Sequence, residues 1–121
     1  MAAIKNIKSR EQRYFVIKSD YEYMRVSYSD IMYGIIADRK LDIHLITGEI
    51  YPVRKTIKEF ISELNLQNFI QVNSGCVVNI KFIKKFTNID LLLDNDEQLL
   101  ISRNRLKDVK AAMLRYWREK I

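Results

Sequence analysis

One histidine, His44, and one cysteine, Cys76, are the residues of the chain best suited to nucleophilic, acid–base or metal chemistry. His44 alternates with apolar neighbours in a stretch that predicts a strand, which favours a cross-strand surface role over catalysis or metal binding. Cys76 could in principle pair with His44, but it opens an apolar run at 76–78 that is typical of an inert core thiol. The two residues therefore indicate neither a catalytic site nor a metal site.

Acidic side chains gather near residue 95, where Asp94, Asp96 and Glu97 could suggest a calcium loop. The ligand spacing and the glycine of an EF-hand are both absent, so a solvated hairpin turn explains these residues better. The chain also contains no glycine-rich phosphate loop, no dinucleotide-binding motif and no nucleophile elbow. We therefore expect a protein that is not an enzyme, with no metal, no cofactor and no small-molecule substrate.

Basic residues outnumber acidic ones by 21 to 15 in a chain of 121 residues, which gives a formal net charge of +6. This imbalance suggests a polyanionic partner, with nucleic acid and an anionic membrane both as candidates. A single cysteine cannot form an internal disulfide, no signal sequence is apparent, and no apolar run approaches the roughly 20 residues of a membrane helix. The sequence therefore predicts a cytoplasmic protein without a transmembrane segment.

The length fits one domain, which we place at residues 13–121, after a basic leader at 1–12 that need not be ordered. Aromatic and β-branched residues predict strands at 13–19 and 22–28, a third strand after Tyr33, and a hairpin over 41–53. Thr47-Gly48 is typical of a hairpin turn. Pro52 places the returning strand at a sheet edge, because proline lacks the N–H that a central strand needs. The sequence shows no internal repeat.

A short helix is predicted at about 56–65, because Thr56 and Glu59 match a capping box, in which each side chain bonds the other residue's backbone N–H. Apolar residues at three- and four-residue spacing give this helix one buried face, and Asn65 marks its expected end. Residues 69–86 return to a β-type composition, and a last hairpin turns at 94–96. The expected fold is therefore mainly β.

Past Ser102 the pattern becomes helical, and a basic amphipathic helix is predicted at about 105–120. Its apolar face carries Tyr116 and Trp117, which are large enough to anchor an interface. Packing onto the same domain and contact with a second copy both remain open for this face. A basic helix with a tryptophan also suits an anionic membrane surface. RNA binding is less favoured, because it would expose aromatics for stacking, and those of this chain mostly alternate into core positions.

Four segments carry a resemblance to a known family: SDIMYG at 29–34, VRKTIKEF at 53–60, FIQVNSGCVVNIKFIKKF at 69–86 and LLISRNRLKDV at 99–109. Together they resemble the LytTR domain, a DNA-binding module of bacterial transcription regulators that is often attached to a response-regulator receiver. The strongest signal is the spacing of Phe69, Val72, Val77-Val78-Asn79 and Ile83, which is similar to the family's middle motif. The resemblance implies an elongated arrangement of small β-sheets with one short helix and a C-terminal helix.

The resemblance also implies sequence-specific binding of duplex DNA, in which loops, and not a recognition helix, enter successive major grooves. Arg103 matches the family's terminal Ser-Arg motif, and its guanidinium fork can donate to both O6 and N7 of guanine. Asn73 and Ser74 fall in the middle contact loop, where an amide can pair with adenine. Arg39 and Lys40 fall in the first contact loop. These five residues are the predicted base contacts.

Three further residues are better placed to contact phosphates, which position a protein without reading sequence: Lys55, Asn104 and Arg105. Asn79 is predicted to stabilise the fold by hydrogen bonding. The chain differs from the family's usual pattern at 73–76, ahead of the Val-Asn pair, so the resemblance carries no target sequence with it. The expected partner is duplex DNA with repeated half-sites, on which the protein could form a homodimer.

A structural alternative stands beside each predicted base contact. Arg103 could form a surface ion pair with Asp94, Asp96 or Asp108. The short polar side chains at 73–74 could cap a turn, and residues 39–40 could form a solvated hairpin tip. The competing function is a protein-interaction or membrane-surface module that uses the basic C-terminal helix.

Overall fold

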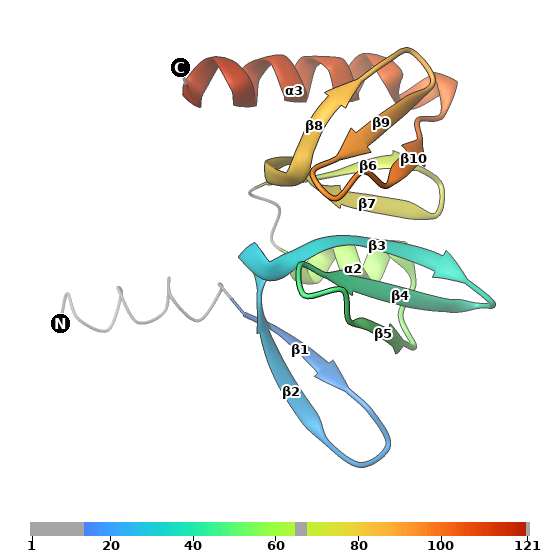
Figure 1. Cartoon of the computed structure of the whole chain (residues 1–121). Helices are drawn as coiled ribbons and strands as arrows, with labels where there is room; N and C mark the ends of the chain where they lie inside the picture. Colours follow the sequence, from blue (N-terminus) through green and yellow to red (C-terminus); the bar gives the residue numbers. More distant parts are fainter. Residues whose placement is uncertain (1–13, 65–67, 121) are drawn as a thin grey trace, which may run out of the picture.

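The computed structural model of the protein describes residues 14–64 and 68–120, so the predicted leader at 1–12 and the expected helix end at Asn65 lie outside the described residues. Within them the chain forms three antiparallel sheets and two α-helices, stacked in layers (Figure 1). The prediction of a mainly β fold with one short helix and a C-terminal helix is therefore confirmed.

The described residues contain ten strands, two α-helices and three short 3-10 helices. The strands are β1 (Tyr14–Lys18), β2 (Tyr23–Ser27), β3 (Ile31–Ala37), β4 (Lys40–Leu45), β5 (Ile50–Val53), β6 (Phe69–Asn73), β7 (Cys76–Asn79), β8 (Ile83–Phe86), β9 (Asp90–Leu93) and β10 (Gln98–Leu100). The helices are α2 (Ile57–Leu64), α3 (Leu106–Lys120), η1 (Tyr28–Asp30), η2 (Ile80–Phe82) and η3 (Arg103–Arg105).

The central sheet has five strands in the order β5-β4-β3-β7-β6. Pro52 lies in β5 opposite Asp42 of β4, so it stands on an edge strand, as predicted from its missing N–H. Gly34 lies in the middle strand β3, where a Cβ atom would come within 2.6 Å of the ring of Phe60. The absence of a side chain at this position is what lets α2 approach the sheet closely.

Both faces of the central sheet are buried. Successive side chains of a strand point to opposite faces, so neighbouring residues of one strand enter different cores. In β7, Val77 points to the face covered by the β1–β2 hairpin and α2, whereas Cys76 and Val78 point to the face covered by β8–β10 and α3 (Figure 1). Two core clusters result. Members of the first include Phe15, Ile17, Val26, Phe60 and Leu64, and members of the second include Leu91, Leu93, Leu99, Val109 and Met113.

The capping box at the start of α2 is confirmed. The backbone N–H of Thr56 donates to Oε1 of Glu59 at 2.9 Å, and the N–H of Glu59 donates to Oγ1 of Thr56 at 3.0 Å. The hydrogen bonds from the backbone and side chain of Thr56 lower the pKa of Glu59, because they favour the ionised carboxylate. The helix therefore begins at Ile57, close to the predicted position.

The apolar face of α3 packs onto its own domain. Val109 and Met113 are fully buried in the second core cluster, and Tyr116 packs against it. The ring of Trp117 stacks on Phe86 with the ring centroids 5.7 Å apart. The predicted helix at 105–120 is therefore confirmed, and its apolar face packs within the domain.

Residues 69–86, predicted as β-type throughout, are interrupted by η2, and Asn79 is the cause. Its Oδ1 accepts the N–H of Lys81 at 3.1 Å, while its Nδ2 donates to the carbonyl of Ile31 at 2.9 Å. Such local bonds from a short polar side chain offer the backbone an alternative to the strand ladder. Asn79 is only 3% exposed, so its predicted role in stabilising the fold is confirmed.

An internal repeat relates the meander β3–β5 to the meander β8–β10, although the sequence shows none. Each unit follows a 3-10 helix and begins with a register shift in its first strand pair. The second turn of each meander, β4–β5 in one and β9–β10 in the other, has the same hydrogen bond: a leucine N–H donates to the carbonyl of a glutamate four residues later at 2.9 Å. The residue before that glutamate has a positive φ in both turns. The likeness is thus one of backbone structure, without a matching repeat in the sequence. Equivalent residues are Leu45 and Leu93, Gly48 and Asp96, and Glu49 and Glu97.

The β1–β2 hairpin carries several aromatic side chains that do not point into the core. Tyr14, Tyr21 and Tyr23 are exposed, with Tyr21 at the tip 97% exposed. The guanidinium of Arg25 lies 4.7 Å from the centroid of the Tyr14 ring, which partly covers it. The expectation that aromatics mostly point inward thus holds for Phe15 of this hairpin but not for its three exposed tyrosines.

Candidate nucleic-acid interface

The three segments predicted to contact DNA lie together on one side of the molecule. They are the β3–β4 turn, the β6–β7 turn and η3, which all lie toward the right in Figure 1. Backbone hydrogen bonds connect them in this order. The N–H of Ile36, before the β3–β4 turn, donates to the carbonyl of Gly75 in the β6–β7 turn at 2.8 Å. The N–H of Ser102, before η3, donates to the carbonyl of Val72 in β6 at 2.9 Å. We call residues 39–40, 73–74 and 103–105 together the contact face.

Asn73 holds the middle of the contact face. Its Oδ1 accepts the N–H of Gly75 at 3.0 Å, and its Nδ2 donates to the carbonyl of Leu100 at 2.8 Å. Asn73 therefore caps the β6–β7 turn, as the structural alternative predicted. Its amide keeps one N–H and one oxygen lone pair for a further partner. Ser74 is exposed beside it.

Arg103 stands at the start of η3 with its side chain exposed. Among the residues that the structure describes, it forms no ion pair, and Asp96, one of its three candidate partners, pairs with Lys84 at 3.0 Å. The ion-pair alternative for Arg103 is therefore not realised here. Asn104 is exposed and Arg105 half-buried, so η3 presents a guanidinium and an amide to solvent.

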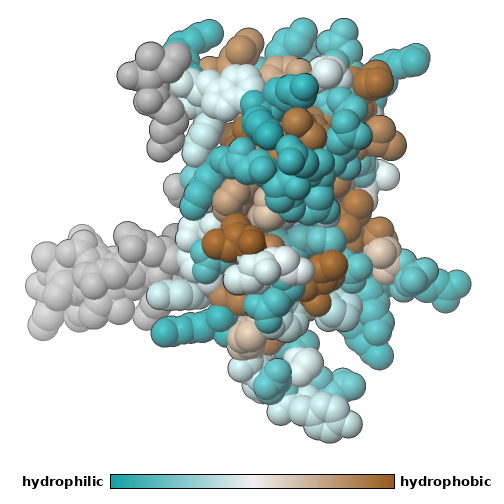
Figure 2. Space-filling model, viewed as in Figure 1, coloured by the Kyte–Doolittle hydropathy of each residue, from teal (hydrophilic) through white to brown (hydrophobic). Residues whose placement is uncertain are grey.

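The β3–β4 turn is formed by Asp38 and Arg39, which both have a positive φ, of 49° and 68°. Two such residues in a two-residue hairpin form a type I′ turn, which matches the twist of the strands. An L-residue in the left-handed region costs roughly 1–2 kcal/mol, and arginine is not among the residues that tolerate it well. Figure 2 shows hydrophilic side chains protruding where this turn lies. The side chains of Arg39 and Lys40 are both exposed at this turn, so residues 39–40 form the solvated hairpin tip of the structural alternative.

Two neighbouring cations after β5, Arg54 and Lys55, differ in their surroundings. Nζ of Lys55 pairs with Oε1 of Glu63 at 2.7 Å and lies 6.0 Å from the ring centroid of Phe15. Arg54 is exposed and makes no ion pair within residues 14–64 and 68–120. Lys55 is the one of the two that the sequence predicts as a phosphate contact, and Arg54 was not predicted to have a role. The sequence contains a feature that distinguishes the two cations, because Glu63, the ion-pair partner of Lys55, lies on the helix that starts just after Lys55.

His44 and Cys76 have the structural roles predicted for them. His44 is half-buried and stacks on its cross-strand partner Tyr33 with the ring centroids 4.1 Å apart, and burial lowers its pKa. Cys76 is fully buried, which raises the pKa of its thiol to about 12. No group of three or more His, Cys, Asp or Glu side chains in the described part of the chain lies close enough to hold a metal ion.

Most of the chain matches one known family. The family model of the LytTr DNA-binding domain covers residues 21–114. The chain belongs to this family. The resemblance seen in the sequence is therefore confirmed, and this LytTr domain is a DNA-binding domain.

A solved structure has the same fold as this LytTr domain. It is the LytTr DNA-binding domain of a Bacillus cereus protein described as a methyl-accepting/DNA response regulator, with a TM-score of 0.72 and 21% sequence identity. The match covers 84% of this chain and 96% of that chain, and at this identity the likeness shows the fold alone. No curated protein matches the chain.

A membrane-surface role would require an apolar face on α3 that the fold leaves open. Among its described side chains, Leu114 is the exposed large apolar residue, at 46% exposure, while Val109 and Met113 are buried. No helix in the described part of this LytTr domain is long and apolar enough to cross a membrane. The amphipathic character of α3 is thus explained by packing within the domain.

Proposed function

We propose that this LytTr domain binds duplex DNA sequence-specifically as part of a bacterial transcription regulator that acts in the cytoplasm. Its contact face reads bases in successive major grooves, and it needs no metal, nucleotide or redox partner to do so. The observation that carries the proposal is the hydrogen-bonded alignment of three exposed segments, with arginines at both ends, in a chain of a DNA-binding family.

Arg103 is the main base-reading residue in this proposal. Its exposed guanidinium donates to O6 and N7 of a guanine, the bidentate contact that separates guanine from the other bases in the major groove. The bond between Ser102 and Val72 supports the role, because it fixes the backbone directly before Arg103 to the central sheet. A guanidinium held on a fixed backbone loses less conformational freedom on binding.

The other two segments read neighbouring positions. Asn73 and Ser74 contact bases from the β6–β7 turn, where the unused N–H and lone pair of the Asn73 amide suit adenine. Arg39 and Lys40 reach the next groove from the β3–β4 turn. The exposed position of both side chains at the tip of a two-residue type I′ turn supports this placement.

Backbone phosphates are contacted by Lys55, Asn104 and Arg105. For Lys55 this requires exchange of its ion pair with Glu63 for a phosphate. A surface ion pair of this kind contributes about 0–1 kcal/mol, so the exchange costs little. Each phosphate neutralised releases counterions, which makes binding depend steeply on salt.

One domain of this size reads a short site, so we propose that two copies bind repeated half-sites, as a homodimer on DNA. Single DNA-binding modules bury about 600–1,000 Å2 of protein surface, which supports recognition of only a few base pairs. Pairing two half-sites supplies the remaining specificity through their spacing.

Selection of bound duplexes from a random DNA pool tests the proposal. We expect an enriched motif with two related half-sites, and a log–log salt slope of about −0.9 per phosphate contact on that motif. A chelator should leave binding unchanged. The double variant Arg39→Ala/Arg103→Ala is the control and should enrich no motif. A pool that stays random with the wild-type protein, or a flat salt response, would contradict the proposal.

A further inference from the structure

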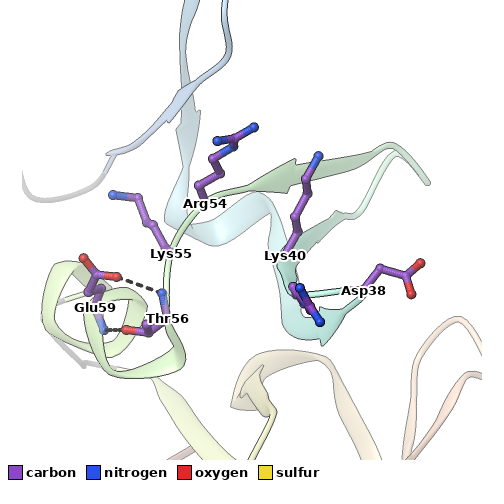
Figure 3. A pocket seen from close by; sticks show the side chains of 7 residues that line it. Asp38, Lys40, Arg54, Lys55, Thr56 and Glu59 are labelled. Atoms are coloured by element: carbon purple, nitrogen blue, oxygen red, sulfur yellow. Dashed lines mark hydrogen bonds between the residues drawn. The ribbon is translucent and has the colours of Figure 1, made fainter.

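A hollow of about 500 Å3 opens on the surface beside the β3–β4 turn (Figure 3). It lies between that turn and the connection from β5 to α2, next to the Arg39 end of the contact face. Four of its lining residues are basic: Arg39, Lys40, Arg54 and Lys55. The hollow is open to solvent, so it suits part of a macromolecule better than an enclosed small ligand.

The register of the central sheet brings two of these cations to the same end of one strand pair. β4 and β5 pair with Leu41 opposite Val53 at the end of the ladder, and Lys40 and Arg54 are the residues next to this last pair. Like charges brought together across neighbouring strands are destabilising. Figure 3 shows both side chains extending in the same direction. The pair therefore concentrates positive charge that an anion between the two groups would neutralise.

The acidic side chains of the hollow do not neutralise this pair. The carboxylate of Glu59 is bound by the backbone N–H of Thr56 in the capping box. Asp38 points away from Arg54 in Figure 3. Neither acid forms an ion pair with a described residue. The negative charge of Glu59 therefore lies at the N-terminal end of α2, where it balances the positive end of the helix dipole.

Lys55 is the one cation of the hollow with a partner within the fold. Its ammonium is held by Glu63 at 2.7 Å and turns to the other side from Lys40 in Figure 3. Arg54 has no such partner among residues 14–64 and 68–120. Arg54 and Lys40 thus form the pair that is ready to receive an anion.

The geometry points to a phosphodiester site: Lys40 and Arg54 together hold one phosphate of the DNA backbone in this hollow. The inference rests on the proposed function and adds a residue, Arg54, that anchors the β3–β4 turn to DNA. Two neighbouring cations match the two non-bridging oxygens of a phosphodiester, and charge-assisted bonds of this kind are the strong ones. This arrangement moves Lys40, which the sequence predicted as a base contact, to the DNA backbone, while Arg39 still reaches the bases.

Duplexes with one neutral methylphosphonate linkage at a time, scanned along the preferred site, test the inference. With the wild-type domain we expect one linkage in each half-site, besides those contacted by Lys55, Asn104 and Arg105, whose neutralisation weakens binding roughly tenfold, as for one charge-assisted hydrogen bond. Arg54→Ala should weaken binding to the unmodified duplex by a similar factor and lower the salt slope by about one unit. In that variant only Lys40 remains at the phosphate, so neutralising the same linkage should weaken binding much less than in the wild type, and in Lys40→Ala/Arg54→Ala it should have no further effect. Arg54→Lys should keep most of the wild-type sensitivity to this linkage.

Arg118→Ala is the matched control, because Arg118 is an exposed arginine near the C-terminal end of α3, outside the contact face. For this variant, neutralising each linkage should weaken binding by the same factor as for the wild type. Inorganic phosphate at constant ionic strength should leave the amide resonances of residues 38–40 and 54–56 in place, and saturable shifts there would overturn the phosphodiester assignment in favour of free phosphate.

The inference and the proposed function fail differently. If Arg54→Ala and Lys40→Ala bind the preferred duplex as the wild type does, with an unchanged salt slope, while Arg103→Ala still loses selectivity, the phosphodiester site is wrong and the proposed function stands. If the wild-type domain binds no duplex at all, both are wrong.

Discussion

The side-chain amide of Asn73 donates a hydrogen bond of 2.8 Å to the backbone carbonyl of Leu100, a residue 27 positions further along the chain. The same side chain accepts the N–H of Gly75 through its oxygen. Asn73 therefore connects the β6–β7 turn to the segment that leads into Arg103. A single polar side chain sets the position of one part of the contact face relative to another.

Replacing Asn73 should affect how Arg103 contributes to binding. Asn73→Ala removes the bond to Leu100, so the segment before Arg103 is less well positioned. In a double-mutant cycle we expect Asn73→Ala and Arg103→Ala to be non-additive, with an interaction energy of about 0.5–3 kcal/mol in binding to the preferred duplex. Ser74→Ala, which removes no hydrogen bond between the described residues and that segment, should be additive with Arg103→Ala. Additive losses for both pairs would show that Asn73 does not position Arg103.

Replacing the turn residue Arg39 with glycine should increase the stability of the fold and weaken DNA binding. Glycine adopts a positive φ without the steric cost that arginine bears at 68°, so Arg39→Gly should raise the free energy of unfolding by up to about 1 kcal/mol. The same change removes the guanidinium and should weaken DNA binding. Urea unfolding and duplex titration measure the two effects. An unchanged or lower stability would mean that the turn holds Arg39 without strain.

The half-buried His44 should make stability depend on pH. Burial lowers its pKa in the folded state, while the nearby carboxylates of Glu97 and Asp42 act in the opposite direction. The unfolded chain binds a proton first as the pH falls below about 6.5, so the contribution of neutral His44 is fully present above that pH and is lost below it. His44→Gln should flatten this part of the stability–pH curve and leave DNA binding at pH 7.5 unchanged. An identical curve for the variant would contradict the assignment.

The sequence predicted correctly those elements that depend on one residue or on residues close together in the chain. The capping box of Thr56 and Glu59 placed the start of α2, because its two hydrogen bonds join residues only three positions apart. Pro52 placed β5 at an edge, because a missing N–H is a property of one residue. Arg103, Asn73 and the β3–β4 turn were selected through the family resemblance, and the structure brings their segments together.

Features that depend on distant partners were missed. The repeat of the two meanders is carried by backbone hydrogen bonds and turn geometry, and Gly48 and Asp96 occupy its equivalent positions with unlike side chains. Arg54 and Lys55 look alike in the sequence, and only the position of Glu63 separates a paired cation from an available one. The register that brings Lys40 and Arg54 to the same end of the β4–β5 ladder likewise exists only once the strands have paired.

Binding of Arg103 variants to the preferred and a scrambled duplex, at one fixed salt concentration, tests the central claim most directly. If Arg103 reads a guanine, Arg103→Ala costs about 1–3 kcal/mol on the preferred duplex, much less on the scrambled one, and relaxes the preference at one base position. Arg103→Lys keeps the charge without the bidentate fork and restores only part of the loss. Equal losses on the two duplexes for Arg103→Ala would contradict base reading and leave Arg103 as a phosphate contact.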